Sequence, residues 1–178
     1  MYQIFLTGER LYLRLIEQTD FISSVEWLND QTTTKWMQNG MYPKTEKEMK
    51  AYYNSMQKPN LYLAINIKGQ NRYIGNISLK NNTQNGYYSE ISIIIGDKSS
   101  WGKGYASEAI KLLADHCFQR LNIHKLKAGA VVDNEACIKA FIKAGFKIES
   151  TEREAVFSEG KFRDISVMTL FKREMEAQ

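Results

Sequence analysis

The sequence predicts a single mixed α/β domain built on one central sheet. Three observations favour this class. Several short segments alternate apolar and polar residues with the period of a strand, whereas other segments carry apolar residues at helical spacing. The chain has 178 residues, enough for one domain with a substantial core. The expected order is β-α-α-β-β-β-α-β-α-β-β, about seven strands and four helices, with residues 1–178 as one domain.

The N-terminal third is expected to contain a strand and two helices. Residues 11–16 alternate like a strand, and either Thr19 or Asp20 can cap a helix that continues to Leu28. An irregular aromatic segment, 36–43, follows. Next, Thr45 and Glu48 have the spacing of a capping box and start a second helix that runs to about Gln57.

A three-stranded meander occupies the middle of the chain. Its strands are expected at 61–67, 73–79 and 87–95, with turns at 69–71 and 85–86. In the third strand, alternation places Glu90, Ser92 and Ile94 on one face and Ile91, Ile93 and Ile95 on the other.

The C-terminal half alternates helices and strands. A long helix is expected over 106–121, a short buried strand over 126–132 and a helix over 134–144 that stops at Gly145. Residues 146–157 and 162–171 form a final hairpin around Glu159-Gly160.

A glycine-containing loop, 99–106, joins the third strand of the meander to the long helix. The first N–H groups of a helix have no internal partner, and the helix dipole makes this end partially positive. Gly102 and Gly104 let a phosphate approach the backbone, and Lys103 adds a cation. The loop lacks the P-loop pattern and the third glycine of a dinucleotide fingerprint, so an ordinary strand-to-helix turn is the alternative.

The composition argues against several classes of function and location. The formal charge of +4 is mild and scattered, which argues against nucleic acid, and no run of residues has the length and apolarity of a membrane span. The two cysteines, Cys117 and Cys137, are too few for a disulfide framework, so we expect the protein to be in the reducing cytoplasm. Without a Cys-x-x-Cys motif or a histidine cluster, no metal is expected.

The order of elements and three motifs resemble the GCN5-related N-acetyltransferase (GNAT) family. Within it, the chain is similar to the branch of ribosomal-protein N-terminal acetyltransferases and spermidine acetyltransferases. The motifs are 90–95 running into 101–109, 132–135 at the start of the late helix, and 144–146 at its end. The usual loop reads Gln/Arg-x-x-Gly-x-Gly/Ala. Here Trp101 stands at the Gln/Arg position, while Gly104 and Ala106 match.

The resemblance implies acetyl-coenzyme A as cosubstrate, with no metal. The loop backbone would cradle the pyrophosphate. The pantetheine arm would add to the edge of the preceding strand, and Asn134 would bond it, although Asn134 also reads as a plain helix cap. The cofactor-binding residues implied are Ile93, Ile94, Ile95, Trp101, Gly102, Lys103, Gly104, Tyr105, Ala106 and Asn134.

The implied reaction is direct attack of a primary amine on the thioester. Glu90 is the candidate base, with Ser92 beside it, and an ion-paired surface glutamate is the alternative. The late-helix tyrosine that protonates the thiolate in several family members is Phe141 here, which cannot donate. Cys137, one turn earlier, is the remaining candidate on that helix, and a small buried hydrophobe is its other interpretation.

The acceptor is expected to be a small molecule, such as an amino sugar or similar metabolite. Trp36 and Tyr42 are candidate walls of its slot, with core packing as the alternative. Two other functions stay open: a ribosomal-type protein N-terminal acetyltransferase, and an acyl-coenzyme A-binding module with little catalysis. A homodimer through strand edges is also compatible with the sequence.

Overall fold

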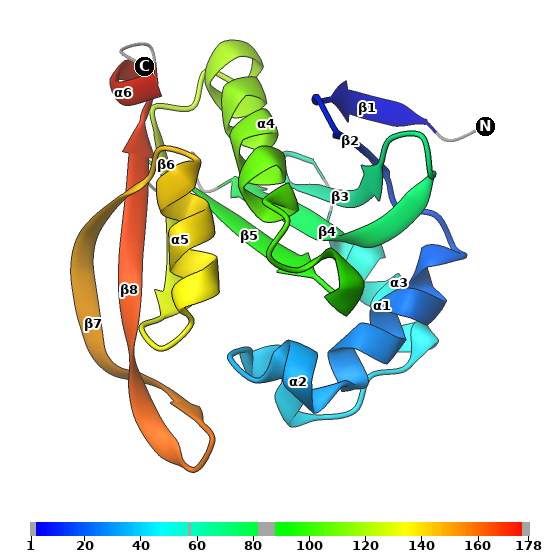
Figure 1. The fold of residues 1–178 in the computed structure, drawn as a ribbon, viewed down its shortest axis with the longest axis horizontal. Coiled ribbons are helices and arrows are strands. Elements are labelled where there is room, and N and C mark those ends of the chain that lie inside the picture. The colour runs from blue at the N-terminus through cyan, green and yellow to red at the C-terminus, as the bar shows by residue number, and fades with distance from the viewer. Residues whose placement is uncertain (1–2, 57, 82–87, 176–178) are drawn as a thin grey trace.

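An eight-stranded sheet forms the centre of the computed structural model, which describes residues 3–56, 58–81 and 88–175 (Figure 1). Its strand order is β1-β2-β3-β4-β5-β6-β8-β7. The strands are β1 (Ile4–Thr7), β2 (Leu11–Leu15), β3 (Leu61–Ile67), β4 (Arg72–Asn81), β5 (Ser89–Ile95), β6 (Lys125–Val131), β7 (Lys147–Ser158) and β8 (Lys161–Phe171). The helices are α1 (Asp20–Asn29), α2 (Gln31–Thr34), α3 (Glu46–Ser55), α4 (Tyr105–Arg120), α5 (Glu135–Lys143) and α6 (Lys172–Met175), with 3-10 turns η1 (Gln38–Met41) and η2 (Lys98–Ser100).

The mixed α/β class is confirmed, but the sequence underestimates the number of elements. The strand β1 and the one-turn helices α2 and α6 are additional. Each is only four residues long, too short to show a hydrophobic period. The predicted turn at 85–86, the residue Tyr87 and the predicted helix end at Gln57 lie outside the described residues, and α3 is described as ending at Ser55.

Of the N-caps predicted for α1 and α3, only that of α3 is correct. The Thr45 hydroxyl accepts the Glu48 N–H, and Glu48 accepts the Thr45 N–H, which completes the capping box of α3. The cap predicted for α1 is wrong, because Thr19 makes no side-chain capping bond. Asp20 instead accepts the Glu17 N–H and forms an ion pair with the buried guanidinium of Arg14.

The sheet separates two hydrophobic layers. On one face, α4 and α5 cover a large core that includes Ile91, Leu113 and Phe141. On the opposite face, α1 and α3 cover a smaller cluster centred on Phe21 and Met49. The alternation predicted for residues 90–95 is confirmed, because Ile91, Ile93 and Ile95 belong to the α4 layer.

The sheet opens between its two central strands. The strands β5 and β6 run parallel and are in register only at Ser89–Leu126 and Glu90–Lys127. Beyond those pairs β6 continues beside β8, whereas β5 continues beside β4. The two halves of the sheet therefore diverge as a V below α4 and α5 (Figure 1). The open side of β5 leads directly to the loop before α4.

Candidate active site

The loop before α4 presents free backbone to solvent. Gly102 and Gly104 have φ angles of 71° and 80°, in the left-handed region that favours glycine. Nothing lies within 4 Å of the position that a Cβ on Gly102 would occupy. Because α4 begins at Tyr105, the unpaired N–H groups of its first turn open onto this space. This open backbone leaves room for the phosphate group that the sequence predicts at the glycines.

A hydrogen-bonded brace ties this loop to the turn between β1 and β2. The Glu108 carboxylate, in the first turn of α4, accepts from the backbone N–H and the Nε of Arg10 at 2.7 and 2.8 Å. The Arg10 Nη1 in turn donates to the carbonyl of Lys103 at 2.9 Å. The guanidinium also lies 5.0 Å from the centre of the Tyr105 ring. Arg10 therefore fixes both the loop and the first turn of the helix.

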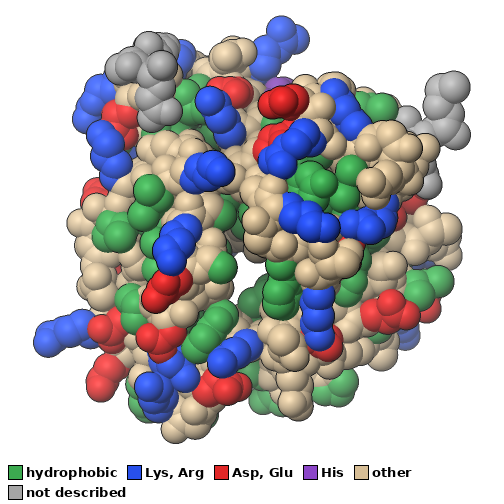
Figure 2. Space-filling view, in the orientation of Figure 1, with side chains coloured by type: hydrophobic (Ala, Val, Ile, Leu, Met, Phe, Trp, Pro, Cys, Tyr) green, Lys and Arg blue, Asp and Glu red, His purple; other side chains and the backbone are tan. Residues whose placement is uncertain are grey.

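Cations surround the same loop. The Arg10 Nη2 lies 3.4 Å, and the Lys143 Nζ 4.0 Å, from the point where a Cβ on Gly104 would be. Lys103 is exposed on the loop itself. Figure 2 shows Lys and Arg side chains gathered on this face, next to an opening between the two halves of the molecule. The sequence indicated Lys103 alone, because Arg10 and Lys143 reach the loop only through the fold.

The open edge of β5 leads away from this loop. The Gly96 N–H donates to the Ile74 carbonyl of β4, and in an antiparallel ladder alternate residues turn their backbone groups toward the same neighbour. Ile94 thus directs its N–H and C=O toward β4, whereas Ile93 and Ile95 direct theirs toward the gap. The Ile95 carbonyl accepts the indole N–H of Trp101 at 2.7 Å. Trp101 therefore fastens the loop to the strand, and the backbone of Ile93 faces the gap.

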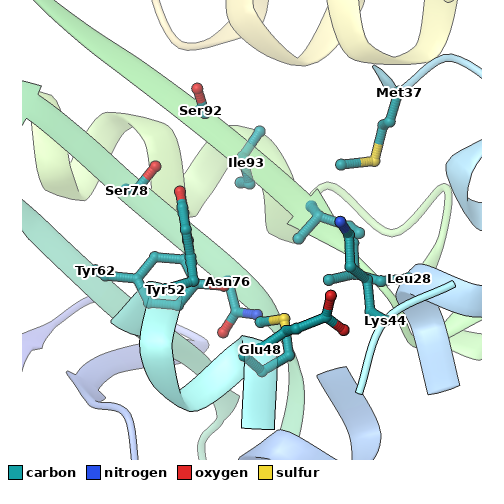
Figure 3. Close-up of a pocket in the computed structure, with 12 residues that line it drawn as sticks. Leu28, Met37, Lys44, Glu48, Tyr52, Tyr62, Asn76, Ser78, Ser92 and Ile93 are labelled. Atoms are coloured by element: carbon teal, nitrogen blue, oxygen red, sulfur yellow. The ribbon is translucent and has the colours of Figure 1, made fainter. Parts of the chain in front are cut away.

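A pocket lies against β5 on the face covered by α1 and α3. Its volume is about 190 Å³ (Figure 3). Its floor follows the register of the sheet, since Tyr62, Ser78 and Ser92 are cross-strand neighbours on β3, β4 and β5. The rest of the lining consists of Leu28, Met37, Lys44, Glu48, Met49, Tyr52, Asn76, Ile93 and Ile94. The pocket and the open edge of β5 thus meet at Ile93.

The two tyrosines of the pocket are neutral hydrogen-bonding groups. Burial raises the pKa of both Tyr52 and Tyr62 above the ordinary value for a phenol. Their rings meet edge to face, with centroids 5.5 Å apart. The sequence analysis missed both residues. Tyr62 lies on the predicted strand 61–67, and the observed register puts it opposite Ser78, which in turn pairs with Ser92.

Of the two predicted catalytic residues on β5, only Ser92 lines the pocket. Glu90 lies two residues earlier on the same face, about 7 Å along the strand. Its register neighbours are Lys80 on β4 and Lys127 on β6. The carboxylate is half-buried at the closed end of the V.

The late helix α5 carries the other predicted residues. The Asn134 side chain accepts the Cys137 N–H at 3.2 Å, so Asn134 is the N-cap of α5. Burial raises the pKa of the Cys137 thiol to about 11, which keeps it protonated at neutral pH. Phe141 is buried against Phe146, with ring centroids 5.1 Å apart, and belongs to the core.

The two aromatic residues predicted to contact the acceptor lie outside the pocket lining. Trp36 is packed beneath Arg163, whose guanidinium is 4.7 Å from the ring centre. Arg163 also pairs with Asp133 and donates to the Ser158 carbonyl, so Trp36 helps hold the β7–β8 hairpin against the segment after α2. Tyr42 is 75% exposed. From this segment it is Met37 that reaches the pocket.

Two further properties concern metals and membranes. Within residues 3–56, 58–81 and 88–175, no three His, Cys, Asp or Glu side chains gather into a group that could hold a metal ion. Across that same part of the chain, every helix is too short or too polar to cross a bilayer.

Comparisons with known proteins concern the family and the fold. The family described as "Acetyltransferase (GNAT) domain" matches residues 10–147. An uncharacterized N-acetyltransferase, p20 of Bacillus licheniformis, is 29% identical over 95% of this chain and 97% of its own length.

Two solved structures share the fold. The spermidine N-acetyltransferase of Vibrio cholerae, in complex with CoA and spermine, superposes with a TM-score of 0.83 at 23% identity, covering 93% of this chain and 97% of that one. The ribosomal L7/L12 α-N-protein acetyltransferase RimL, in complex with coenzyme A, gives 0.82 at 17% identity, covering 95% and 98%.

Proposed function

Because this chain belongs to the GNAT acetyltransferase family, we propose that it transfers the acetyl group of acetyl-CoA to the primary amine of a small molecule. Acetyl-CoA-dependent N-acetylation is the activity of the family and therefore of this enzyme, which sets aside a purely acyl-CoA-binding role. The proposal concerns the acceptor and the residues that act on it.

The size of the pocket is the main observation in favour of a small-molecule acceptor. Its volume of about 190 Å³ is below the ~300–1,000 Å³ typical of pockets for drug-sized ligands. The lining combines apolar walls from Leu28 and Met37 with the hydroxyls of Tyr52, Tyr62 and Ser78. Such a lining suits a compact polar amine, for example an amino sugar.

The residues on the other face of the sheet fit the cosubstrate. The N–H groups from Gly102 to Ala106 would receive the pyrophosphate, with Arg10 and Lys143 beside them. The pantetheine arm would extend along the free edge of β5, where Ile93 offers both an N–H and a C=O. Acetyl-CoA, when bound, supplies the thioester carbon that the amine attacks.

The acceptor must lose a proton during the reaction. An alkyl amine has a pKa of about 10, so it arrives protonated at neutral pH. Glu90 is the proposed base, with Ser92 between it and the pocket. At about 7 Å from Ser92 it would act through an intervening water. The Ile93 N–H is placed to stabilise the negative charge that develops on the thioester oxygen.

The thiolate would leave without a proton from α5. Phe141 has no acidic hydrogen, and a Cys137 thiol with a pKa of about 11 is a weaker acid than the thiol that it would have to protonate. Cys137 is therefore better described as a packing residue beside Asn134. The reaction needs only the amine, the base and the polarised carbonyl.

A protein N-terminal acetyltransferase of the ribosomal type is the second candidate. The opening between the β7–β8 half and the α4 loop favours it, because an extended peptide end could enter there (Figure 2). The small pocket beyond that opening favours the first candidate.

Mass spectrometry can decide between the two candidates. The enzyme is incubated with acetyl-CoA and one of three acceptor pools: amino sugars and sugar nucleotides, polyamines and aminoglycosides, or short peptides with free N-termini. We expect a product heavier by one acetyl group in a small-molecule pool. Acetylation confined to the peptides would replace the proposal with the ribosomal-type activity. No product in any pool, with acetyl-CoA binding verified in the same sample, would contradict both candidates.

A further inference from the structure

A lysine stands in the wall of the acceptor pocket without a salt-bridge partner. Lys44 is half-buried and lines the pocket between Met37 and Glu48 (Figure 3). Among the residues that the structure describes, its Nζ makes no ion pair within 4.0 Å and no side-chain hydrogen bond. A cation partly removed from water in this way gains from an anionic ligand.

One oxygen of the only carboxylate among the described lining residues, Oε2 of Glu48, is already engaged. Glu48 accepts the Thr45 N–H and hydroxyl at 2.8 and 2.9 Å, and these bonds are the main reason that the pKa of Glu48 lies below its ordinary value. Both bonds end on the same oxygen, Oε2, at the exposed start of α3. The nearby Lys44 lowers the pKa of Glu48 a little further, but the two groups do not form a salt bridge.

The backbone of Lys44 is held rigidly in place. The Asn29 side chain, at the end of α1, accepts the Lys44 N–H at 2.7 Å and donates to the Lys44 carbonyl at 2.9 Å. This pair of hydrogen bonds aligns the Lys44 backbone against α1, and the Lys44 side chain extends toward β5 (Figure 3). The ammonium is therefore presented to the pocket by a fixed backbone, so less ordering is needed when a ligand binds.

The remaining polar groups of the lining are neutral. They are the phenols of Tyr52 and Tyr62, the amide of Asn76 and the hydroxyls of Ser78 and Ser92. An acceptor with several positive charges would thus meet one carboxylate, with one of its oxygens already hydrogen-bonded, and one ammonium of its own sign. Like charges brought together in a partly buried site repel each other, which disfavours a polyamine.

We propose that Lys44 is the specificity-determining residue of the pocket and that it selects primary amines that also carry an anionic group, such as a phosphate or carboxylate. This inference rests on the proposed small-molecule function. The amine reaches the thioester beside Ser92 and Ile93, while the anion is bound by the Lys44 ammonium. The acceptor class is then an acidic amine, in contrast to a polyamine.

Matched pairs of acceptors test this inference. Glucosamine is compared with glucosamine 6-phosphate, and 1,5-diaminopentane with lysine, by measuring kcat/KM at saturating acetyl-CoA. In the wild-type enzyme we expect the anionic member of at least one pair to be preferred by about 10- to 100-fold, the usual contribution of a hydrogen bond to a charged group. In Lys44→Met that preference should disappear, because the anionic amine loses its cationic partner, and in Lys44→Glu it should reverse.

Lys47→Met is the matched control. It removes the same charge from the exposed side of α3, outside the pocket lining, and should leave the preference unchanged. Acetylation of these amines with no preference for the anionic member, or a preference that survives Lys44→Met, would overturn the role of Lys44 and leave the proposed function intact. If none of the amines is acetylated although acetyl-CoA binds, the small-molecule function fails and this inference fails with it.

Discussion

Replacing Gly104 by valine tests the proposed acetyl-CoA site. The residue has a φ of 80°, immediately before the first turn of α4. Its added Cβ would meet only side-chain atoms at ordinary contact distances: Arg10 Nη2 at 3.4 Å, Ser107 Oγ at 3.9 Å and Lys143 Nζ at 4.0 Å. The variant should therefore fold. Its new side chain would occupy the space in which a phosphate must approach the loop backbone.

The expected cost in stability is small and the expected cost in binding is large. An L-residue in the left-handed region costs about 1–2 kcal/mol, which lowers Tm by roughly 2–8 °C in a chain of this length. Preventing two charge-assisted hydrogen bonds to phosphate removes about 3–6 kcal/mol of binding free energy. The Kd for acetyl-CoA should therefore rise by about 100-fold or more.

Gly69→Val separates the two effects. Gly69 lies in the turn between β3 and β4 with a nearly equal φ of 75°, and nothing lies within 4 Å of its Cβ position. Its Tm should fall as in Gly104→Val while the Kd stays at the wild-type value. Both quantities come from calorimetry and thermal denaturation of the same preparations. If Gly104→Val binds acetyl-CoA like the wild type at temperatures where it is folded, the loop is not the phosphate site.

Three further outcomes are expected. Glu90→Gln should lower kcat by about 100-fold or more with the Kd for acetyl-CoA unchanged, and an unchanged kcat would remove Glu90 from the mechanism. Asp20→Ala breaks the ion pair with Arg14; the Asp20 side chain is 5% exposed and the Arg14 side chain 2%. The variant should lower the free energy of unfolding, measured by urea denaturation, by about 3–5 kcal/mol, and a decrease below about 1 kcal/mol would contradict a structural role for the pair. Burial raises the pKa of Cys117 from 9.0 to about 12, so the folded state keeps its thiol protonated while the unfolded thiol ionises. The resulting stability is complete below pH 9 and is lost as pH rises from 9 toward 12, and a Cys117→Ala variant should show a shallower decline over that window.

The elements that the sequence predicted are those with a strong local signal. The capping box of Thr45 and Glu48 lies within four residues, and the meander alternates over whole strands, so neighbouring residues carry all the information. The glycine loop before α4 is likewise local. The two central glycines and the helix that follows are consecutive in the chain, so the predicted phosphate site needed no knowledge of the tertiary fold.

The rest of the site depends on contacts between distant segments. Arg10 and Glu108 are 98 positions apart, and nothing near either residue indicates the other. Lys44 looks like one more surface lysine until Asn29 and the register of β3 to β5 place it over a pocket. The failed cap at Thr19 has a nearer cause, because Arg14, six positions before Asp20, holds that carboxylate in a buried ion pair that the hydrophobic pattern does not reveal.

The alternation of β5 directs its residues toward the two proposed ligand sites at once. Ile93 turns its backbone toward the gap beside β6, whereas Ser92 and Ile94 turn their side chains into the pocket beneath α1 and α3. Because the strand period is two residues, a one-residue insertion near Ser89 would exchange these roles and close both sites together. The proposed acetyl-CoA edge and the proposed acceptor pocket are therefore two consequences of one register. Their meeting at Ile93 is what would bring the amine to the thioester.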